Sequence, residues 1–437
     1  MKLRSFLSFD IFIFFSVIAL MVIGVLFIYS SGVSSSGVVY TNEYIKQIIS
    51  ISIGLILCLV FSFGNYSRLG EWSLYFYFAG IFALVYTLFF GKVINGARAW
   101  ITIGSFHIGQ PSEIMKIFTI LYLGNFFDQH RNSINKISTL FISLGIVALP
   151  MGLVLLQPDM GTALVFVPIY FFSAFIASVP LRYLFFLFLS GCLTVFIGIL
   201  PEWNSAILHN DGFFIRILTD SSLWPYLTAV SVLIMLLSLI GYIFYHRRYF
   251  YWTGFFSFSS GLSFIGAFLM QKVLKDYQIM RLIVFLDPEI DPRGTGWHII
   301  QSITAVGSGG FYGKGFLKGT QSQYRFLPMQ STDFIFSIIA EEWGFIGSFL
   351  VLLLFTVILL RGIYIIWTAK DRYGKIIGAG IIGMLFFHMV VNIGMTMGIM
   401  PITGIPLPFV SYGGSSILNS LIAIGILLNI HQRRYHF

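Results

Sequence analysis

Long apolar stretches alternate with short polar connections along almost the whole chain. A helix that crosses the hydrocarbon core of a membrane needs about 20 mostly apolar residues. Twelve stretches come close to this length: 11–29, 45–63, 73–90, 113–127, 139–156, 162–179, 183–200, 226–245, 250–271, 334–360, 376–398 and 408–430. The pattern predicts an all-α polytopic integral membrane protein with about 12 transmembrane helices, in a single membrane domain over residues 1–437.

Lys and Arg are concentrated in alternate connections and at both ends of the chain. Lys2, Arg131, Arg182, Arg372 and Arg433 belong to this set, whereas the intervening short connections hold few basic residues. Short cytoplasmic loops carry an excess of Lys and Arg. The distribution therefore predicts an even number of spans with both termini in the cytoplasm.

The composition excludes several classes of protein. Of 437 residues, 57% are hydrophobic and 10% are charged, and the mean hydropathy is +0.88. A soluble domain has roughly 25% charged residues, so the chain is neither a soluble domain nor a disordered one. Basic cytoplasmic loops account for the net charge of +9, and we expect no nucleic-acid partner.

The longest connection, 273–333, lies on the outer face in this topology. It is rich in Gly and carries aromatic residues such as Trp297, Phe311 and Tyr312. Long connections without secondary structure are usually either functional or disordered. The aromatic and glycine content favours a large ordered extracytoplasmic loop packed on the helices.

Two motifs within this loop have turn-like composition. Three carboxylates lie in 287–291, and two of them belong to Asp-Pro steps, which are typical of turns. The alternative interpretation is a divalent cation that the carboxylate oxygen atoms bind. The second motif, 307–315, looks like a phosphate loop, but Ser308 and Gly315 occupy positions where a P-loop needs Gly and Ser or Thr. Its backbone N–H groups remain suited to a pyrophosphate.

Asp333 lies where the loop enters the next predicted span, after Ser331 and Thr332. Such residues commonly cap a helix, and the helix dipole favours a carboxylate there. A carboxylate at the boundary between water and membrane is also what a general base needs to act on a lipid-linked substrate. Glu341 and Glu342 follow two turns later, where we expect basic partners inside the bundle.

Glu113 and Lys116 form a second candidate. They lie three residues apart on one face of a helix that begins near Pro111. Unpaired charges are costly at membrane depth, so an ion pair is expected. Either it supports the end of the helix or it forms the wall of a polar cavity that opens to the outside.

Two further segments contain candidate cavity residues. Asp159, in the stretch 157–162, either belongs to a tight turn or faces the same cavity as the Glu113–Lys116 pair. Ser411 belongs to the stretch 400–416, where three prolines and three glycines interrupt an apolar run. Irregular backbone at membrane depth is tolerated only where protein buries it or where it lines a cavity.

These segments together resemble the SEDS family (shape, elongation, division and sporulation). The matching stretches are 110–116, 157–162, 287–296, 298–323, 326–328, 332–336 and 404–415. The runs 305–310 and 319–323 look like the elongation branch of the family. The family commonly has about ten spans, so the resemblance identifies 180–248 as the site of an inserted pair of helices.

The resemblance implies a peptidoglycan glycosyltransferase of the bacterial cytoplasmic membrane that maintains cell shape. Such enzymes polymerise lipid II at the extracytoplasmic face, together with a class B penicillin-binding protein and the elongation machinery. Asp333 matches the essential aspartate of the family, and Glu113 and Lys116 match its helical pair.

The implied reaction requires a base and positive charge for the diphosphate leaving group. Asp333 is the expected base, or a ligand of a divalent cation (Mg or Mn). The candidate cations for the diphosphate are Lys116, Arg281, Arg293, Lys314, Lys318 and Arg325. Two alternatives remain open: a lipid II flippase, and a non-catalytic scaffold that activates the penicillin-binding protein.

Overall fold

The computed structural model describes residues 10–34, 37–94, 96–103, 106–208, 212–274, 276–292, 294–324 and 326–434. The chain divides into two compact units. Unit 1 comprises Met1–Val179 and Trp297–Phe437, and unit 2 comprises Pro180–Gly296. Both are built mainly of long apolar helices, and each is described here by itself.

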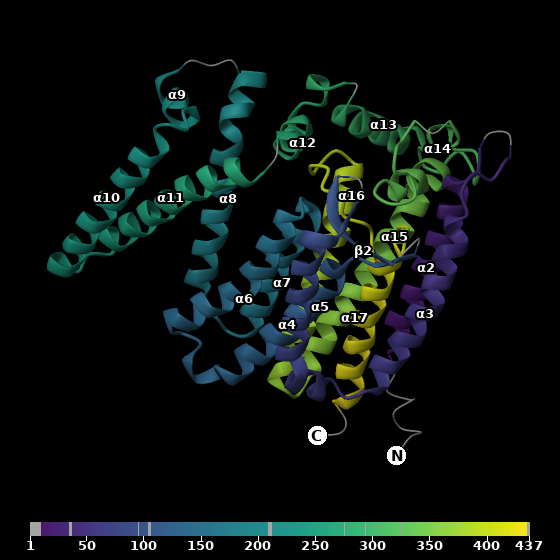
Figure 1. Cartoon of the computed structure of the whole chain (residues 1–437), viewed down its shortest axis with the longest axis horizontal. Coiled ribbons are helices and arrows are strands. Elements are labelled where there is room, and N and C mark those ends of the chain that lie inside the picture. Colours follow the sequence, from purple (N-terminus) through teal and green to yellow (C-terminus); the bar gives the residue numbers. More distant parts are fainter. Residues whose placement is uncertain are drawn as a thin grey trace. The chain divides into compact units, whose positions relative to one another are not determined.

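Unit 1 contains nine long helices among its described residues (Figure 1). They are α2 (Ile11–Ser31), α3 (Glu43–Phe63), α4 (Tyr66–Phe90), α5 (Pro111–Gln129), α6 (Ile137–Leu156), α7 (Met160–Ile176), α15 (Ile335–Thr368), α16 (Arg372–Thr396) and α17 (Gly414–Arg433). Polar residues begin several of them: the carboxylates of Asp10 and Asp371 accept hydrogen bonds from first-turn N–H groups of α2 and α16. Pro111 opens α5, where a missing N–H costs nothing.

Shorter elements lie between these helices. The strands β1 (Lys92–Ile94), β2 (Ala97–Ile103) and β3 (Phe106–Gly109) form a small antiparallel sheet between α4 and α5. The predicted long loop is helical in part. It holds α12 (Asp276–Leu286) and a 3-10 turn (Pro288–Ile290) in unit 2, then α13 (Thr295–Ser308) and α14 (Thr320–Gln323).

The core of unit 1 is formed around α16 and α17, whose most apolar windows are 78% buried. α17 packs closely against α3, and a Cβ on Gly425 would lie 2.6 Å from the backbone oxygen of Cys58. Small residues allow such close approach of membrane helices. The two central helices are therefore surrounded by other helices of the unit.

A helix occupies each of the twelve predicted ranges. Within the described residues, ten helices are long and apolar enough to cross a membrane. The other two are α5, which carries Glu113 and Lys116, and α7, which has 17 residues. The predicted last span begins later than expected, at Gly414 rather than near residue 408, because Pro406 and Pro408 keep the preceding backbone out of a helix.

Unit 2 consists of α8 (Leu181–Trp203), a π-helical turn (Asn204–Leu208), α9 (Phe213–Thr219), α10 (Trp224–Tyr245), α11 (Arg248–Val273) and α12. α10 and α11 form a long antiparallel hairpin (Figure 1), which reverses at His246 in the left-handed conformation. Its apolar cluster is small: Ile197, Trp224, Phe264 and Ala267. The predicted inserted pair, 180–248, lies in this unit and stays a prediction, as does the single membrane domain.

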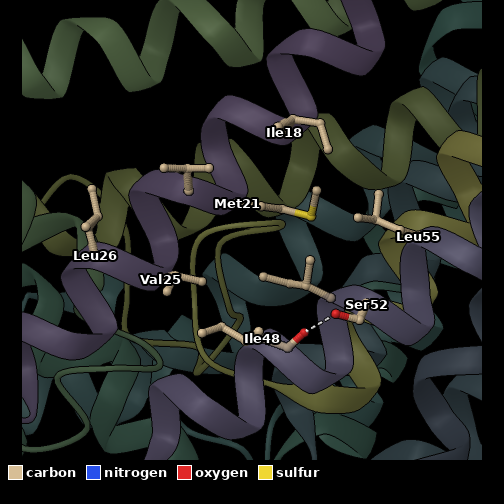
Figure 2. A pocket seen from close by; sticks show the side chains of 9 residues that line it. Ile18, Met21, Val25, Leu26, Ile48, Ser52 and Leu55 are labelled. Carbon is tan, nitrogen blue, oxygen red and sulfur yellow. Dashed lines mark hydrogen bonds between the residues drawn. The ribbon is translucent and has the colours of Figure 1, made fainter.

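An apolar groove of about 350 Å³ lies between α2 and α3 (Figure 2). Eight of its nine lining residues are aliphatic or methionine, and Ser52 donates its hydroxyl to the backbone oxygen of Ile48 at 2.9 Å. The groove contains none of the predicted site residues. It is an apolar surface feature of these two helices.

Candidate functional site

Asp333 lies in a turn directly before α15. Its backbone N–H donates to the oxygen of Met329 at 3.2 Å, and its side chain is partly exposed. The residue at the N-cap of α15 is Phe334, with no side-chain capping bond. The assigned cap position thus falls one residue after Asp333, and the role of Asp333 as a base stays a prediction.

The carboxylate of Asp333 faces Gly404. A Cβ built on Gly404 would lie 3.6 Å from Oδ2 of Asp333, and Gly404 has a φ of +71°. An L side chain rarely adopts this conformation. Gly404 therefore leaves space beside the carboxylate that a larger residue would occupy.

Gly404 belongs to the irregular segment 397–413 between α16 and α17. Side chains satisfy much of its backbone, as buried polar groups require. The Ser411 hydroxyl accepts from the N–H of Leu407 at 2.8 Å. Gln47 of α3 donates to the oxygen of Ser411 at 3.1 Å and accepts from the N–H of Gly413 at 3.2 Å. Ser411 is thus buried between its own segment and α3.

This segment also contacts the turn that carries Asp333. The N–H of Tyr412 donates to the oxygen of Ser331 at 2.8 Å. The amide of Asn392, on α16, donates both to the oxygen of Asp333 at 3.0 Å and to that of Ile405 at 2.8 Å. The segment and the turn are therefore joined at two points.

Glu113 and Lys116 form a salt bridge of 2.8 Å, with side chains 7% and 1% exposed. Lys116 also approaches Nε2 of His388 at 3.3 Å, and Nδ1 of His388 lies 3.1 Å from the oxygen of Pro406. The ammonium and the carbonyl fix the tautomer, because Nε2 must accept and Nδ1–H must donate. The pair is enclosed, as expected if it supports the end of the helix. Its place in the wall of an open polar cavity stays a prediction.

Asp159 caps α7. Its carboxylate accepts from the N–H and the hydroxyl of Thr162, at 3.0 and 2.8 Å, and from the side-chain amide of Gln110 at 2.6 Å. The N–H of Gln110 donates to the hydroxyl of Ser415 at 3.1 Å. These bonds fit the turn interpretation, and the place of Asp159 in a cavity stays a prediction. Through Gln110, Asp159 links the starts of α5, α7 and α17.

Two carboxylates of α15 hold the glycine-rich part of the loop. Glu341 accepts from Lys314 at 2.8 Å and from the N–H of Thr320 at 2.8 Å. Glu342 accepts from Ser30 at 2.6 Å and from the N–H of Leu317 at 3.0 Å. The expected basic partner exists for Glu341, and the charge of Lys314 is already balanced.

The remaining candidates are distributed as follows. Lys318 is exposed, and Arg281 belongs to unit 2 together with the motif 287–291. Asp287 accepts from the N–H of Glu289 at 3.0 Å, as the turn interpretation requires. Arg293 and Arg325 lie outside the described residues.

Three polar residues of the site had no role in the sequence analysis: Gln47, His388 and Asn392. His388 and Asn392 are four residues apart and share one face of α16. A polar pair at this spacing inside a predicted span was the available signal. Among the described residues, no group of three or more His, Cys, Asp and Glu is placed to hold a metal ion.

Comparisons with known proteins identify relatives over nearly the full chain. The model of a family described as cell cycle protein (FtsW, RodA and SpoVE) matches residues 10–210 and 225–436. The peptidoglycan glycosyltransferase RodA of Treponema pallidum is 44% identical over 441 residues, which cover 99% of this chain and all of the relative. The peptidoglycan glycosyltransferase MrdB of Escherichia coli K12 is 32% identical over 417 residues, covering 95% of this chain and 92% of MrdB.

The fold also has a solved counterpart. A chain from a structure on the coordination of polymerization and crosslinking by a peptidoglycan synthase complex is 26% identical, with a TM-score of 0.67. The match covers 98% of this chain and 99% of that one. The all-α polytopic membrane fold predicted from the hydropathy pattern is thus confirmed.

Proposed function

Because the chain belongs to the FtsW, RodA and SpoVE family of cell cycle proteins, we propose that it polymerises lipid II at the extracytoplasmic face of the bacterial cytoplasmic membrane. The protein is a peptidoglycan glycosyltransferase, like the relatives that match it over nearly their full length. What is proposed here is the chemistry of its site, its orientation and its partners.

Asp333 acts as the general base in this proposal. Its carboxylate accepts the proton of the 4-hydroxyl of an acceptor GlcNAc. The oxygen then forms a bond to C1 of the donor MurNAc, while the bond from C1 to undecaprenyl diphosphate breaks. The observation that supports this assignment is a partly exposed carboxylate, directly before α15, that faces Gly404.

The diphosphate leaving group needs positive charge. Lys116 and Lys314 each have a carboxylate partner within 2.8 Å, whereas Lys318 is an exposed cation on the loop held by Glu341 and Glu342. We propose Lys318 as one contact of the diphosphate. Arg281, Arg293 and Arg325 stay predicted contacts.

A divalent cation is a separate prediction. Asp333 supplies one carboxylate, and the described residues offer no cluster of three or more ligands. Mg²⁺ usually combines one or two protein carboxylates with substrate phosphates and waters. No step of the reaction is therefore assigned to Mg²⁺ or Mn²⁺.

The basic residues at one end of unit 1 support an orientation of the unit in the membrane. Arg361 pairs with Asp10 at 2.6 Å, and Arg433 donates to the oxygen of Gly64 at 3.0 Å. These contacts lie at the end where α2 begins and α17 ends (Figure 1). Asp333 directly precedes α15, whose other end carries Arg361. Because cytoplasmic ends carry an excess of Lys and Arg, we propose that this end is cytoplasmic and that the end with Asp333 is extracytoplasmic.

A class B penicillin-binding protein is the proposed partner, within the elongation machinery. The structurally similar chain belongs to a peptidoglycan synthase complex that couples polymerization and crosslinking. A polymerase on one membrane face requires a crosslinking enzyme on that same face.

Polymerisation of lipid II by the purified chain in liposomes tests the site. We expect Asp333→Ala to lower the rate about 10²–10⁴-fold, as loss of a general base does, with little change in thermal unfolding. Asp371→Asn is the matched control, since Asp371 starts α16 at the opposite end of unit 1 and Asn can still cap a helix.

The outcomes separate the alternatives. Full activity of a folded Asp333→Ala variant would show that Asp333 is not the base. If wild-type protein makes no glycan even with the penicillin-binding protein present, the flippase and scaffold alternatives gain, and a lipid II translocation assay decides between them.

A further inference from the structure

Asn392 is fully buried in α16, one helical turn after His388. A side-chain amide nitrogen carries two hydrogens. Here one is donated to the backbone oxygen of Asp333 at 3.0 Å and the other to that of Ile405 at 2.8 Å. The two acceptors belong to segments that are far apart in sequence and meet at this one nitrogen.

Both acceptors are tied to the proposed base. One is the carbonyl of Asp333 itself, and the other belongs to the residue after Gly404, which faces the Asp333 carboxylate. A shift of either carbonyl therefore changes the distance between the carboxylate and the space beside Gly404. The geometry points to Asn392 as a positioning residue: it sets the place of the Asp333 carboxylate without touching the substrate.

The surrounding contacts support this assignment. His388 binds the oxygen of Pro406, so two consecutive carbonyls of the irregular segment are held by one face of α16. His388 is in turn held by Lys116, which pairs with Glu113. His388 and Asn392 thus hold neighbouring carbonyls of the irregular segment, and of these two side chains Asn392 also donates to the turn of Asp333.

A buried asparagine that merely satisfies a carbonyl has a counterpart in the same unit. Asn429 of α17 is equally enclosed and donates to the oxygen of Phe61 at 2.6 Å. It lies near the end of α17, away from the Asp333 turn (Figure 1). Asn429→Leu and Asn392→Leu therefore make the same chemical change, and only the second loosens the Asp333 turn.

The proposal rests on the proposed function and is tested by steady-state polymerisation of lipid II by the full chain. We expect Asn392→Leu to lower kcat roughly 10–10²-fold, the effect of a misplacement of about 1 Å, with KM for lipid II within about threefold of wild type. Asn429→Leu is expected to keep both values. Asn392→Asp, which preserves the shape but replaces the donor by an acceptor, serves if the leucine variant does not fold.

The results decide as follows. The positioning role would be overturned if Asn392→Leu had the same kcat as Asn429→Leu. It would also be overturned if Asn392→Leu raised KM and left kcat unchanged. The proposed function fails by a different result, because an active Asp333→Ala variant removes the base itself. A fall in kcat for Asn392→Leu together with loss of activity in Asp333→Ala supports both assignments.

Discussion

Units 1 and 2 have similar hydropathy but differ in what they bury. α10 of unit 2 has a mean hydropathy of 2.4 in its most apolar window, of which 17% is buried, whereas α16 of unit 1 has 2.1 with 78% buried. Surrounding lipid is as apolar as a protein core, so hydropathy does not distinguish the two environments. Polar and small residues mark the enclosed helix instead, as His388, Asn392 and Gly380 do in α16.

The comparison has a consequence for the chemistry. A helix surrounded by other helices can hold charged and amide groups, because their partners are within the protein. Unit 1 uses this environment for Glu113 and Lys116 and for the amide that holds the Asp333 turn. The side chains of the α10–α11 hairpin are largely exposed and apolar, as lipid-facing ones are.

Loss of the buried ammonium is the strongest test of this difference. Lys116→Met leaves the carboxylate of Glu113 buried without its cation, and breaking such a pair costs about 3–5 kcal/mol. Thermal unfolding in detergent measures the loss. Lys272→Met in unit 2 is the control, since Lys272 is exposed and its ammonium lies over the ring of Phe268 at 4.4 Å; its expected cost is at most about 1 kcal/mol.

The double variant Glu113→Gln with Lys116→Met sharpens this result. Removal of both charges is expected to restore much of the stability, because no uncompensated charge remains. Equal loss for the single and double variants would contradict a charge effect and indicate packing of the lysine stem.

A pair of glycines tests close packing in the two units, with a smaller expected effect. Gly425→Ala in α17 places a Cβ 2.6 Å from the backbone oxygen of Cys58 and must push α3 away, at a cost of about 1–3 kcal/mol. Gly254→Ala in α11 meets only ordinary contacts, the nearest being Cβ of Ser238 at 3.4 Å. We expect no loss there, and a gain of up to about 1 kcal/mol from helix propensity. Similar unfolding temperatures for the two variants would contradict the difference in packing.

The smallest expected effect concerns Asp220, in the connection between α9 and α10. Hydrogen bonds from the hydroxyl and the N–H of Ser222, at 2.6 and 3.0 Å, lower the pKa of Asp220 below its ordinary value. The stabilisation is present above the ordinary pKa and is lost as pH falls through the lowered one. Ser222→Ala should raise this pKa, as read by NMR titration of the carboxyl carbon, with no change in polymerisation. An unchanged pKa would show that the hydroxyl does not contribute.

The sequence alone determined the class of the protein and the positions of its helices. The hydropathy of about 20 neighbouring residues is a local property, so each of the twelve predicted stretches contains a helix. The prolines of 400–408 likewise predicted the irregular segment from the residues themselves. The motifs around Asp333 and Glu113 were sufficient to identify the family, because they are short and occur in a set order.

Only the tertiary structure decided which polar residues work together. Asn392 lies 59 residues from Asp333 in sequence and His388 lies 272 residues from Lys116, yet each pair is within 3.3 Å. Sequence spacing predicts contacts within one helix, such as Glu113 with Lys116, but not contacts between helices. The packing of α5, α16 and the irregular segment brings these groups together. A buried polar group without a hydrogen bond is costly, so each needs its partner.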